Sequence, residues 1–185
     1  MLTIRQEKPS DALPREALLD AAYGAVRFEK PSQRLRTGRP AKALCFVAVE
    51  DGRLVGTVRL WDVTAGPDRP TLLLGPLAVD ADRRNRGIGS ALMRHALRAA
   101  ARRSHRAVLL VGDAGYYGRF GFAADKTGRL WLPGLSDRSR LLGIELAAGA
   151  LDGARGAIRA PRKPARTRLA AAVAALAPSL EPKAA

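Results

Sequence analysis

The clearest alternation of hydrophobic and polar positions runs from about residue 43 to residue 80. Two strand-like runs, "ALCFVAVE" and "RLVGTVRLWDV", flank the dipeptide Asp51-Gly52. An Asp-Gly pair tolerates the positive backbone angles of a type I′ turn, so the pattern predicts a β-hairpin. "TLLLGPLAVD" predicts a third strand. Because proline cannot donate to a sheet ladder, we expect a bulge or bend at Gly75-Pro76.

Two segments have helical periodicity. From about Arg86 to Arg103, Ile88, Leu92 and Ala96 recur on one face of a predicted helix. The earlier segment "PSDALPREALLDAAYGAV" predicts a helix that begins at a capping Ser10 or Asp11. Its apolar stripe is expected to pass through these positions: Leu13, Ala17, Ala21 and Val26.

The remaining apolar runs are short. A strand is predicted around Ile4, a buried strand at "RAVLLVGD", a short helix or turn at "AGYYGRFGF" and a last strand at "LLGIELAAGAL". This order of elements predicts an α/β (α+β) layer fold with flanking helices on a mixed, mostly antiparallel sheet. Residues 1–151 are therefore expected to form one domain. Residues 152–185, rich in Ala, Arg and Pro, are expected to form a basic tail with a helix near 165–177.

Composition narrows the classes of function. The chain has 185 residues, of which 47% are apolar, and this is enough for one domain with a substantial core. Its net charge of +15 fits either contact with a polyanion through the tail or simply an arginine-rich chain. One cysteine, Cys45, in an apolar run and two histidines cannot form a disulfide or a structural zinc site, so we expect no metal. No signal peptide or membrane-spanning run is visible, so we expect a cytoplasmic protein without membrane contact.

The stretch "DRRNRGIGSALMRH" combines arginine with glycine where a strand gives way to a helix. It lacks the Lys-Ser/Thr pair of a Walker loop, and Leu92 stands where a dinucleotide fingerprint needs Gly or Ala. What remains is Arg-x-x-Gly-x-Gly, formed by Arg84, Gly87 and Gly89. Glycines at a helix start expose backbone N–H groups, and the helix dipole attracts an anion, so this loop is suited to a pyrophosphate.

The segments "GPLAVDADRRNRGIGSALMRHAL" and "YYGRFGF", in this order, resemble the GCN5-related N-acetyltransferases (GNAT family) over roughly residues 44 to 148. The resemblance is to bacterial acetyltransferases with a "YYGRFGF" ending. It implies a GNAT fold whose strands splay around acetyl-CoA, bound as co-substrate. The implied cofactor-binding residues are Leu77, Ala78, Val79, Arg84, Asn85, Arg86, Gly87, Ile88, Gly89, Ser90 and Tyr117.

The implied activity is that of an N-acetyltransferase, in which a primary amine attacks the acetyl group directly in a ternary complex. Tyr117 is expected to be the general acid for the thiolate, with Tyr116 as the adjacent alternative. The backbone N–H of Val79 is expected to stabilise the oxyanion and to contact pantetheine. Asp62 and Glu29 are weak candidates for the general base, and a water molecule is the alternative.

Several further expectations concern the acceptor side and the surface. Trp61 and the loop Arg27–Arg39 are expected to border the pocket of an unidentified amine, and a basic pocket suits anionic or small neutral amines. His95 and His105 are expected to be structural or solvated. A row of arginines on the long helix forms either a solvated face or a rim for the 3′-phosphate of CoA: Arg94, Arg98 and Arg102. A homodimer is common in the family, but nothing in this sequence fixes it.

The alternative function is an acyl-CoA-binding or polyanion-binding protein that keeps the fold without transferring an acetyl group. The net charge and the basic tail favour contact with nucleic acid or the ribosome. The low aromatic content of 5% and the lack of aromatics interleaved with the basic residues argue against base stacking.

Overall fold

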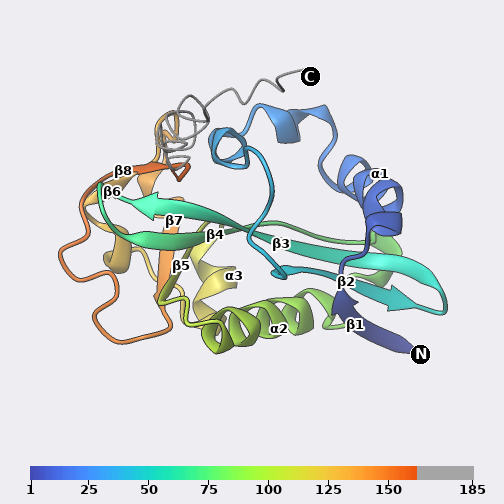
Figure 1. Ribbon diagram of the computed structural model, residues 1–185. Helices are drawn as coiled ribbons and strands as arrows, with labels where there is room; N and C mark the ends of the chain where they lie inside the picture. The colour runs from blue at the N-terminus through green and yellow to red at the C-terminus, as the bar shows by residue number, and fades with distance from the viewer. Residues whose placement is uncertain (162–185) are drawn as a thin grey trace, which may run out of the picture.

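The computed structural model describes residues 1–161, which fold around one twisted sheet (Figure 1). The main path of the sheet has the order β1-β2-β3-β4-β5-β7. Its strands are β1 (Leu2–Gln6), β2 (Cys45–Glu50), β3 (Arg53–Ala65), β4 (Pro70–Val79), β5 (Ala107–Val111) and β7 (Leu141–Glu145). Along this path only β4 and β5 are parallel. The mixed, mostly antiparallel sheet with flanking helices is therefore confirmed.

The predicted hairpin joins β2 to β3. Asp51 and Gly52 have φ angles of 49° and 82°, the pair of positive values that a type I′ turn requires. The irregularity expected at Gly75-Pro76 is also present, because the β3–β4 register shifts between the pairs Val58–Leu77 and Leu60–Leu74. The bulge bends β4 just before the segment that forms the site described below.

Successive side chains of the sheet alternate between two cores. On β5, Val108 and Leu110 pack on the face covered by α2 (Ile88–Arg102), while Ala107 and Leu109 join a second cluster on the opposite face. Helix α2 lies close against the sheet, since a Cβ at Gly56 would be 2.9 Å from Leu92 Cδ1. The predicted apolar face of this helix is confirmed, and β5 is buried on both sides as its sequence indicates.

Helix α1 (Ala12–Tyr23) covers the other face of the sheet, near the start of β3 and the end of β4 (Figure 1). The apolar stripe predicted for it is wrong, because Leu13 is 83% exposed and Val26, beyond the helix end, is 60% exposed. The buried face carries Leu18, Leu19 and a charged residue, Arg15. A search for apolar spacing misses this face because one of its three buried positions is an arginine.

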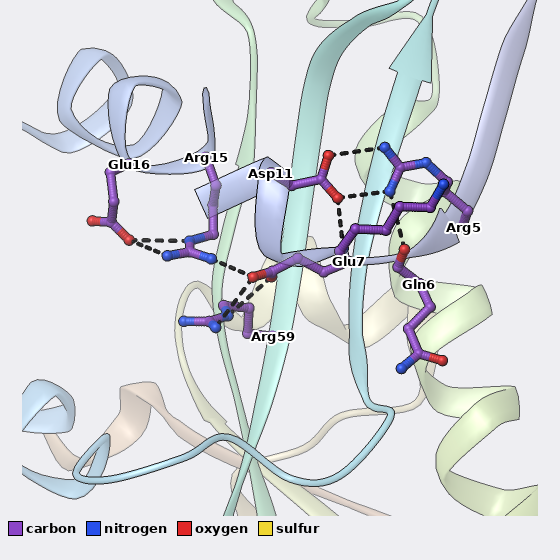
Figure 2. A network of polar contacts seen from close by, with 8 residues as sticks. Arg5, Gln6, Glu7, Asp11, Arg15, Glu16 and Arg59 are labelled. Atoms are coloured by element: carbon purple, nitrogen blue, oxygen red, sulfur yellow. Dashed lines mark hydrogen bonds and ion pairs between the residues drawn. The ribbon is translucent and has the colours of Figure 1, made fainter. Parts of the chain in front are cut away.

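Ion pairs explain how Arg15 can be buried (Figure 2). Its guanidinium pairs with Glu7 and, at 2.8 Å, with Glu16. Glu7 also pairs with Arg59 of β3 at 3.1 Å, so the network ties α1 to the sheet. A buried charge is tolerated when its donors are matched by acceptors in this way.

A second pair lies beside it in Figure 2, where Arg5 makes two hydrogen bonds to Asp11 at 2.6 and 2.8 Å. Asp11 also accepts the N–H of Lys8 at 2.7 Å. Its carboxylate therefore points back toward β1 and makes no capping hydrogen bond to α1. The hydrogen bond from Arg5 lowers the pKa of Asp11 to about 2.

Short helices connect these elements. They are η1 (Pro9–Asp11), η2 (Ala25–Phe28), η3 (Pro31–Leu35), η4 (Ala81–Arg83), α3 (Ala114–Tyr117), η5 (Gly118–Phe120), η6 (Asp125–Thr127) and η7 (Arg138–Arg140). Six of them contribute residues to the site: η2, η3, η4, α3, η5 and η7.

The prediction that the chain's last strand lies near residues 141–151 is wrong. A further strand, β8 (Gly156–Arg159), pairs with β3 through Thr64–Arg159 and Ala65–Ile158, and with the two-residue β6 (Leu130–Trp131). The sheet thus extends into the segment whose composition suggests a tail beginning at Asp152. The predicted helix near 165–177 lies outside the described residues.

Residues 1–161 contain neither a candidate membrane span nor a candidate metal site. No helix in this range has the length and apolar character needed to cross a bilayer. In the same range, no three His, Cys, Asp or Glu side chains are grouped so as to hold a metal ion.

Candidate functional site

The site begins where two neighbouring strands separate. β4 and β5 pair only through Leu72–Val108 and Leu73–Leu109, although β4 continues to Val79. The edge of β4 from Leu74 onward therefore has no strand beside it on this side. Strands that part in this way leave backbone N–H and C=O groups available to a ligand.

The hydrogen-bond alternation of an antiparallel pair shows which groups are available. Asp80 N–H donates to the carbonyl of Val55 on β3 at 2.9 Å. Alternate residues bond to the same neighbour, so Ala78 also faces β3, while Leu77 and Val79 point their backbone groups toward the opening. Consistent with this, the Leu77 carbonyl accepts a hydrogen bond from the hydroxyl of Tyr23.

A groove of about 630 Å³ runs along this edge. The residues that line it are Ala22, Tyr23, Leu77, Ala78, Val79, Arg83, Arg84, Asn85, Gly87, Ile88, Gly89, Ser90, Asp113, Tyr116, Tyr117 and Arg119. Every predicted cofactor-binding residue is among them except Arg86. The groove thus joins the end of β4, the glycine loop and α3.

The glycine loop ends at the start of α2. Asn85 and Gly87 have positive φ angles of 61° and 77°, and Gly87 is the N-cap residue without a side-chain cap. The first helical hydrogen bond runs from Ala91 N–H to the Gly87 carbonyl at 2.9 Å. The N–H groups of Ile88, Gly89 and Ser90 consequently have no acceptor within the helix. Together with the helix dipole they form an anion-binding terminus.

The arginines of this loop divide into two groups. Arg83 and Arg86 both bind Glu50 of β2, at 2.7 and 2.9 Å, and these bonds lower the pKa of that carboxyl group. Arg84 lines the groove and has no ion-pair partner within residues 1–161. Arg84 is therefore the loop arginine that is free to meet an anion, whereas Arg86 holds the loop against β2.

The row of arginines on α2 is exposed, as the solvated-face alternative expects. None of Arg94, Arg98 and Arg102 lines the groove, and Arg94 instead lies 5.7 Å from the centre of the Phe120 ring. Arg119 lines the groove without having been predicted. Its guanidinium stacks 4.1 Å from the ring centre of Tyr116 and donates to the Tyr116 carbonyl at 2.9 Å.

A second cavity, the side cavity, has a volume of about 280 Å³. Its lining residues are Tyr23, Arg27, Lys30, Pro31, Ser32, Arg36, Leu74, Gly75, Pro76, Leu77, Leu110, Val111, Tyr117, Leu135, Ser136, Asp137 and Arg140. Tyr23, Leu77 and Tyr117 line both the groove and the side cavity. A ligand in the groove can therefore meet a ligand in the side cavity at these three residues.

Tyr117 lies at this junction with its ring against the backbone of Gly112. A Cβ at Gly112 would be 2.1 Å from Tyr117 Cε2, so the ring occupies the space that only a glycine leaves open. Burial is the main reason that the pKa of the Tyr117 hydroxyl is raised to about 12, with smaller contributions from Tyr23 and Tyr116. The hydroxyl thus stays protonated at neutral pH and can donate a hydrogen bond.

Tyr116 has a different position. It lines the groove but not the side cavity, and its hydroxyl would be 3.3 Å from a Cβ at Gly89 in the glycine loop. Its backbone N–H donates to Asp113 at 2.7 Å, which caps α3 and fixes the adjacent tyrosines. Of the two, only Tyr117 reaches the junction.

Tyr23 is a site residue that sequence reasoning missed. It ends α1, donates to the Leu77 carbonyl, and lines both cavities. Its only signal in the sequence is an aromatic residue just before the helix-ending Gly24, which is a common pattern without functional meaning. The contact joins residues 54 positions apart and exists only after α1 packs on the sheet.

Other sequence candidates lie elsewhere. Trp61 is only 7% exposed and lines neither cavity. Its Nε1 donates to the Gly75 carbonyl at 2.9 Å, and this hydrogen bond holds the bulge in place. The structure therefore does not place Trp61 at the border of either cavity. Asp62 and Glu29 are exposed and also line neither cavity. His95 packs edge-on against Phe46 at 4.6 Å, as expected of a structural histidine.

Comparisons with known proteins agree with this geometry. The model of the acetyltransferase (GNAT) family matches residues 12–122. The N-acetyltransferase YhbS of Escherichia coli K12, described as uncharacterized, is 32% identical over 161 residues, which cover 85% of this chain and 95% of YhbS.

Two solved structures have the same fold. E. coli YhbS in complex with CoA has a TM-score of 0.73 and 30% identity, over 86% of this chain and 89% of that one. A GNAT family acetyltransferase from Brucella melitensis in complex with acetyl-CoA has a TM-score of 0.67 and 26% identity, over 88% and 97% of the two chains.

Proposed function

The chain belongs to the GNAT family of acetyltransferases, and from that premise we propose that it transfers an acetyl group from acetyl-CoA to a primary amine. The observation that carries the proposal is the junction of two cavities at Tyr23, Leu77 and Tyr117. The groove would hold the acetyl donor and the side cavity the amine. Both substrates then meet in a ternary complex without a covalent enzyme intermediate.

The groove fits the chemical parts of acetyl-CoA. A pyrophosphate suits the free N–H groups of Ile88, Gly89 and Ser90, with Arg84 beside them. The pantetheine arm carries amides that can pair with the open edge of β4, as an added strand would. The N-acetyltransferase YhbS, solved with CoA, supports the same assignment by its similarity.

The chain's own groups supply hydrogen bonds to the reacting centre. Leu77 lines both cavities, so we assign its backbone N–H to the carbonyl oxygen on which negative charge develops. Val79 lies nearer the glycine loop, because its Cγ2 would be 3.5 Å from a Cβ at Gly89. We therefore assign the Val79 backbone to pantetheine and the Leu77 backbone to the oxyanion.

Tyr117 donates its hydroxyl hydrogen to the departing sulfur. With a pKa of about 12 the hydroxyl is a weak acid, so its contribution is a hydrogen bond that stabilises the thiolate as the C–S bond breaks. Among the described residues, Asp137 is the only carboxylate that lines the side cavity, and it already accepts from Ser139. We accordingly assign removal of the amine proton to water.

A protein that binds acyl-CoA without transfer would need the groove alone. The side cavity, which opens onto the same tyrosine, favours the enzyme over this alternative. Contact with a polyanion through the basic tail concerns residues beyond 161, which lie outside the described residues, so the groove and the side cavity do not bear on it.

The test measures release of CoA thiol from acetyl-CoA with a panel of primary amines, together with direct binding of acetyl-CoA. We expect binding and amine-dependent thiol release, with the N-acetylated amine identified by mass spectrometry. Binding without release by any amine would support the acyl-CoA-binding alternative. Absence of binding at millimolar acetyl-CoA would reject both.

A further inference from the structure

The side cavity has an excess of positive charge. Three of its lining residues, Lys30, Arg36 and Arg140, form no ion pair within residues 1–161. They come from separate segments, since Lys30 precedes η3, Arg36 follows it and Arg140 ends η7. Folding thus gathers three cations around a cavity of about 280 Å³.

The other charged groups of the side cavity are already engaged. Arg27 pairs with Glu16 at 2.6 Å and Asp20 at 2.8 Å. Asp137 accepts the backbone N–H of Ser139 at 3.0 Å and its hydroxyl at 2.5 Å. The excess charge is therefore not balanced by the carboxylate that shares the cavity.

Arg36 is the most enclosed of the three cations. Its guanidinium packs on β4, where a Cβ at Gly75 would be 2.7 Å from Arg36 Nη2. Its Nη1 donates to Gln33 Oε1 at 3.3 Å, while its buried Nε has no hydrogen-bond partner among the described residues. A half-buried guanidinium with a donor unused is costly unless an acceptor arrives from outside the chain.

The electrostatics of the group agree with this picture. Burial lowers the pKa of Arg36 to about 10, so that Arg36 remains a cation at neutral pH. Burial, followed by the charges of Arg36 and Arg140, also lowers the pKa of Lys30. The three cations therefore repel one another, and a bound anion would relieve that repulsion.

We propose that the acceptor is a small primary amine that also carries an anionic group, which Arg36 binds with Lys30 and Arg140 beside it. This inference rests on the proposed function and names the substrate class for the same site. The planar guanidinium can bind a carboxylate or a phosphate through two parallel hydrogen bonds. A cavity of about 280 Å³ favours a small molecule.

The anchored anion would direct the amine toward Tyr117 and Leu77. In the reaction the amine nitrogen forms a bond to the acetyl carbonyl carbon, and the bond from that carbon to sulfur breaks. The proton lost by nitrogen passes to water, and the thiolate takes up one proton to become the CoA thiol. Charges balance, and no oxidant or further co-reactant is needed.

The test compares amines that differ only in their anionic group. 4-Aminobutanoate and 4-aminobutanamide have the same length, while 2-aminoethylphosphonate carries a phosphate-like group and 1,4-diaminobutane a second cation. We expect kcat/KM to be about 10-fold to 100-fold higher for an anionic amine than for the amide, which corresponds to one charge-assisted contact. The carboxylate and the phosphonate together show which anion the site prefers.

Arg36→Gln should remove that preference by lowering kcat/KM for the anionic amine only. Arg36→Lys keeps the charge without the planar fork and should retain part of it. Arg34→Gln is the matched control, because Arg34 is an exposed arginine on η3 and lines neither cavity. Acetyl-CoA affinity should be unchanged in all three variants, and none should melt at a lower temperature than the wild type.

A binding measurement gives a readout that does not need turnover. Calorimetric titration of 4-aminobutanoate or 2-aminoethylphosphonate into the CoA-loaded protein should show binding that Arg36→Gln weakens by about 10-fold or more and Arg34→Gln does not.

The outcomes separate the two proposals. If the amide or the diamine is acetylated as efficiently as its anionic counterparts, or if Arg36→Gln leaves the preference unchanged, the inference about the acceptor is overturned while the acetyltransferase stands. If no amine in the panel causes thiol release, the proposed function itself fails.

Discussion

The groove is built mainly from backbone, whereas the side cavity is built mainly from side chains. In the groove, β4 offers its free edge and α2 its uncapped N–H groups, within the continuous stretch from Leu77 to Ser90. The side cavity draws residues from separate segments: 23–36, 74–77, 110–117 and 135–140. A site made of backbone can bind the same cofactor in many sequences, while a site made of side chains can change its ligand by single substitutions.

The two regions depend on each other at Tyr117. Their shared residues are Tyr23, Leu77 and Tyr117, so a substitution there should affect chemistry more than the binding of either substrate. Substitutions on one side only should change the binding of one substrate only. Each of the following tests probes that division.

Tyr117→Phe should have the largest effect. Loss of the hydroxyl should lower kcat about 100-fold, because the departing sulfur loses its hydrogen-bond donor. The acetyl-CoA dissociation constant should stay the same, since the ring still fits against Gly112. Steady-state thiol release and calorimetry measure the two quantities. Tyr116→Phe is the control and should keep most of the activity; a Tyr117→Phe enzyme with normal kcat would remove Tyr117 from the mechanism.

Arg84→Gln should affect the groove alone. We expect acetyl-CoA to bind about 10-fold to 100-fold more weakly, with kcat at saturation retained, because a charge-assisted contact to phosphate is lost. Arg86→Gln is the matched control, since the guanidinium of Arg86 is already bound to Glu50. Equal losses of affinity in the two variants would contradict the division of the loop arginines.

Gly112→Ala should displace Tyr117 without touching either ligand directly. The new methyl group would collide with the ring at 2.1 Å, so the hydroxyl must move and kcat should fall roughly tenfold. Gly118→Ala provides the comparison, because a Cβ there has no neighbour within 4 Å. Similar kcat values for the two variants would show that the packing of the Tyr117 ring against Gly112 is not needed for catalysis.

The smallest expected effect is on the pH profile. Because the pKa of Tyr117 is raised to about 12, the hydroxyl remains protonated as the pH rises from 7 to 10. With 4-aminobutanamide, whose binding does not depend on the charges of Arg36 and Lys30, the rate should therefore rise as the amine loses its proton and should not fall again in this range. A descending limb near pH 9 that disappears in Tyr117→Phe would show that Tyr117 titrates far below this value.

The difference between the two regions also explains what could be predicted. The hairpin turn, the Gly75-Pro76 irregularity and the glycine loop are local features, and each was predicted from neighbouring residues. The part of the groove from Leu77 to Ser90 was predicted because these residues are nearly contiguous. In contrast, Tyr23 and Arg36 carry no local signal. Trp61 was expected at a pocket border, but its position along β3 does not show whether its side chain faces a cavity or, as it does, hydrogen-bonds to Gly75.

Helix α1 shows the same limit on a smaller scale. Its apolar residue Leu13 is exposed, while Arg15 is buried through its ion pairs with Glu7 and Glu16. Amphipathic periodicity assumes that charge faces solvent. Here an ion-pair network between α1 and β3 allows a charged residue of the helix to be buried. Its partners become neighbours only after the sheet has formed.

The amino-acid sequence by itself determined the order of the elements, the hairpin turn and the anion-binding loop with Arg84, Gly87 and Gly89. These features depend on backbone conformations and hydrogen bonds between residues a few positions apart. Tertiary structure alone decided that β4 and β5 part after Leu73, that Tyr117 lies at the meeting point of two cavities, and that Arg36 faces the smaller one. The physical reason is that these arrangements result from packing between segments tens of residues apart, which no local pattern encodes.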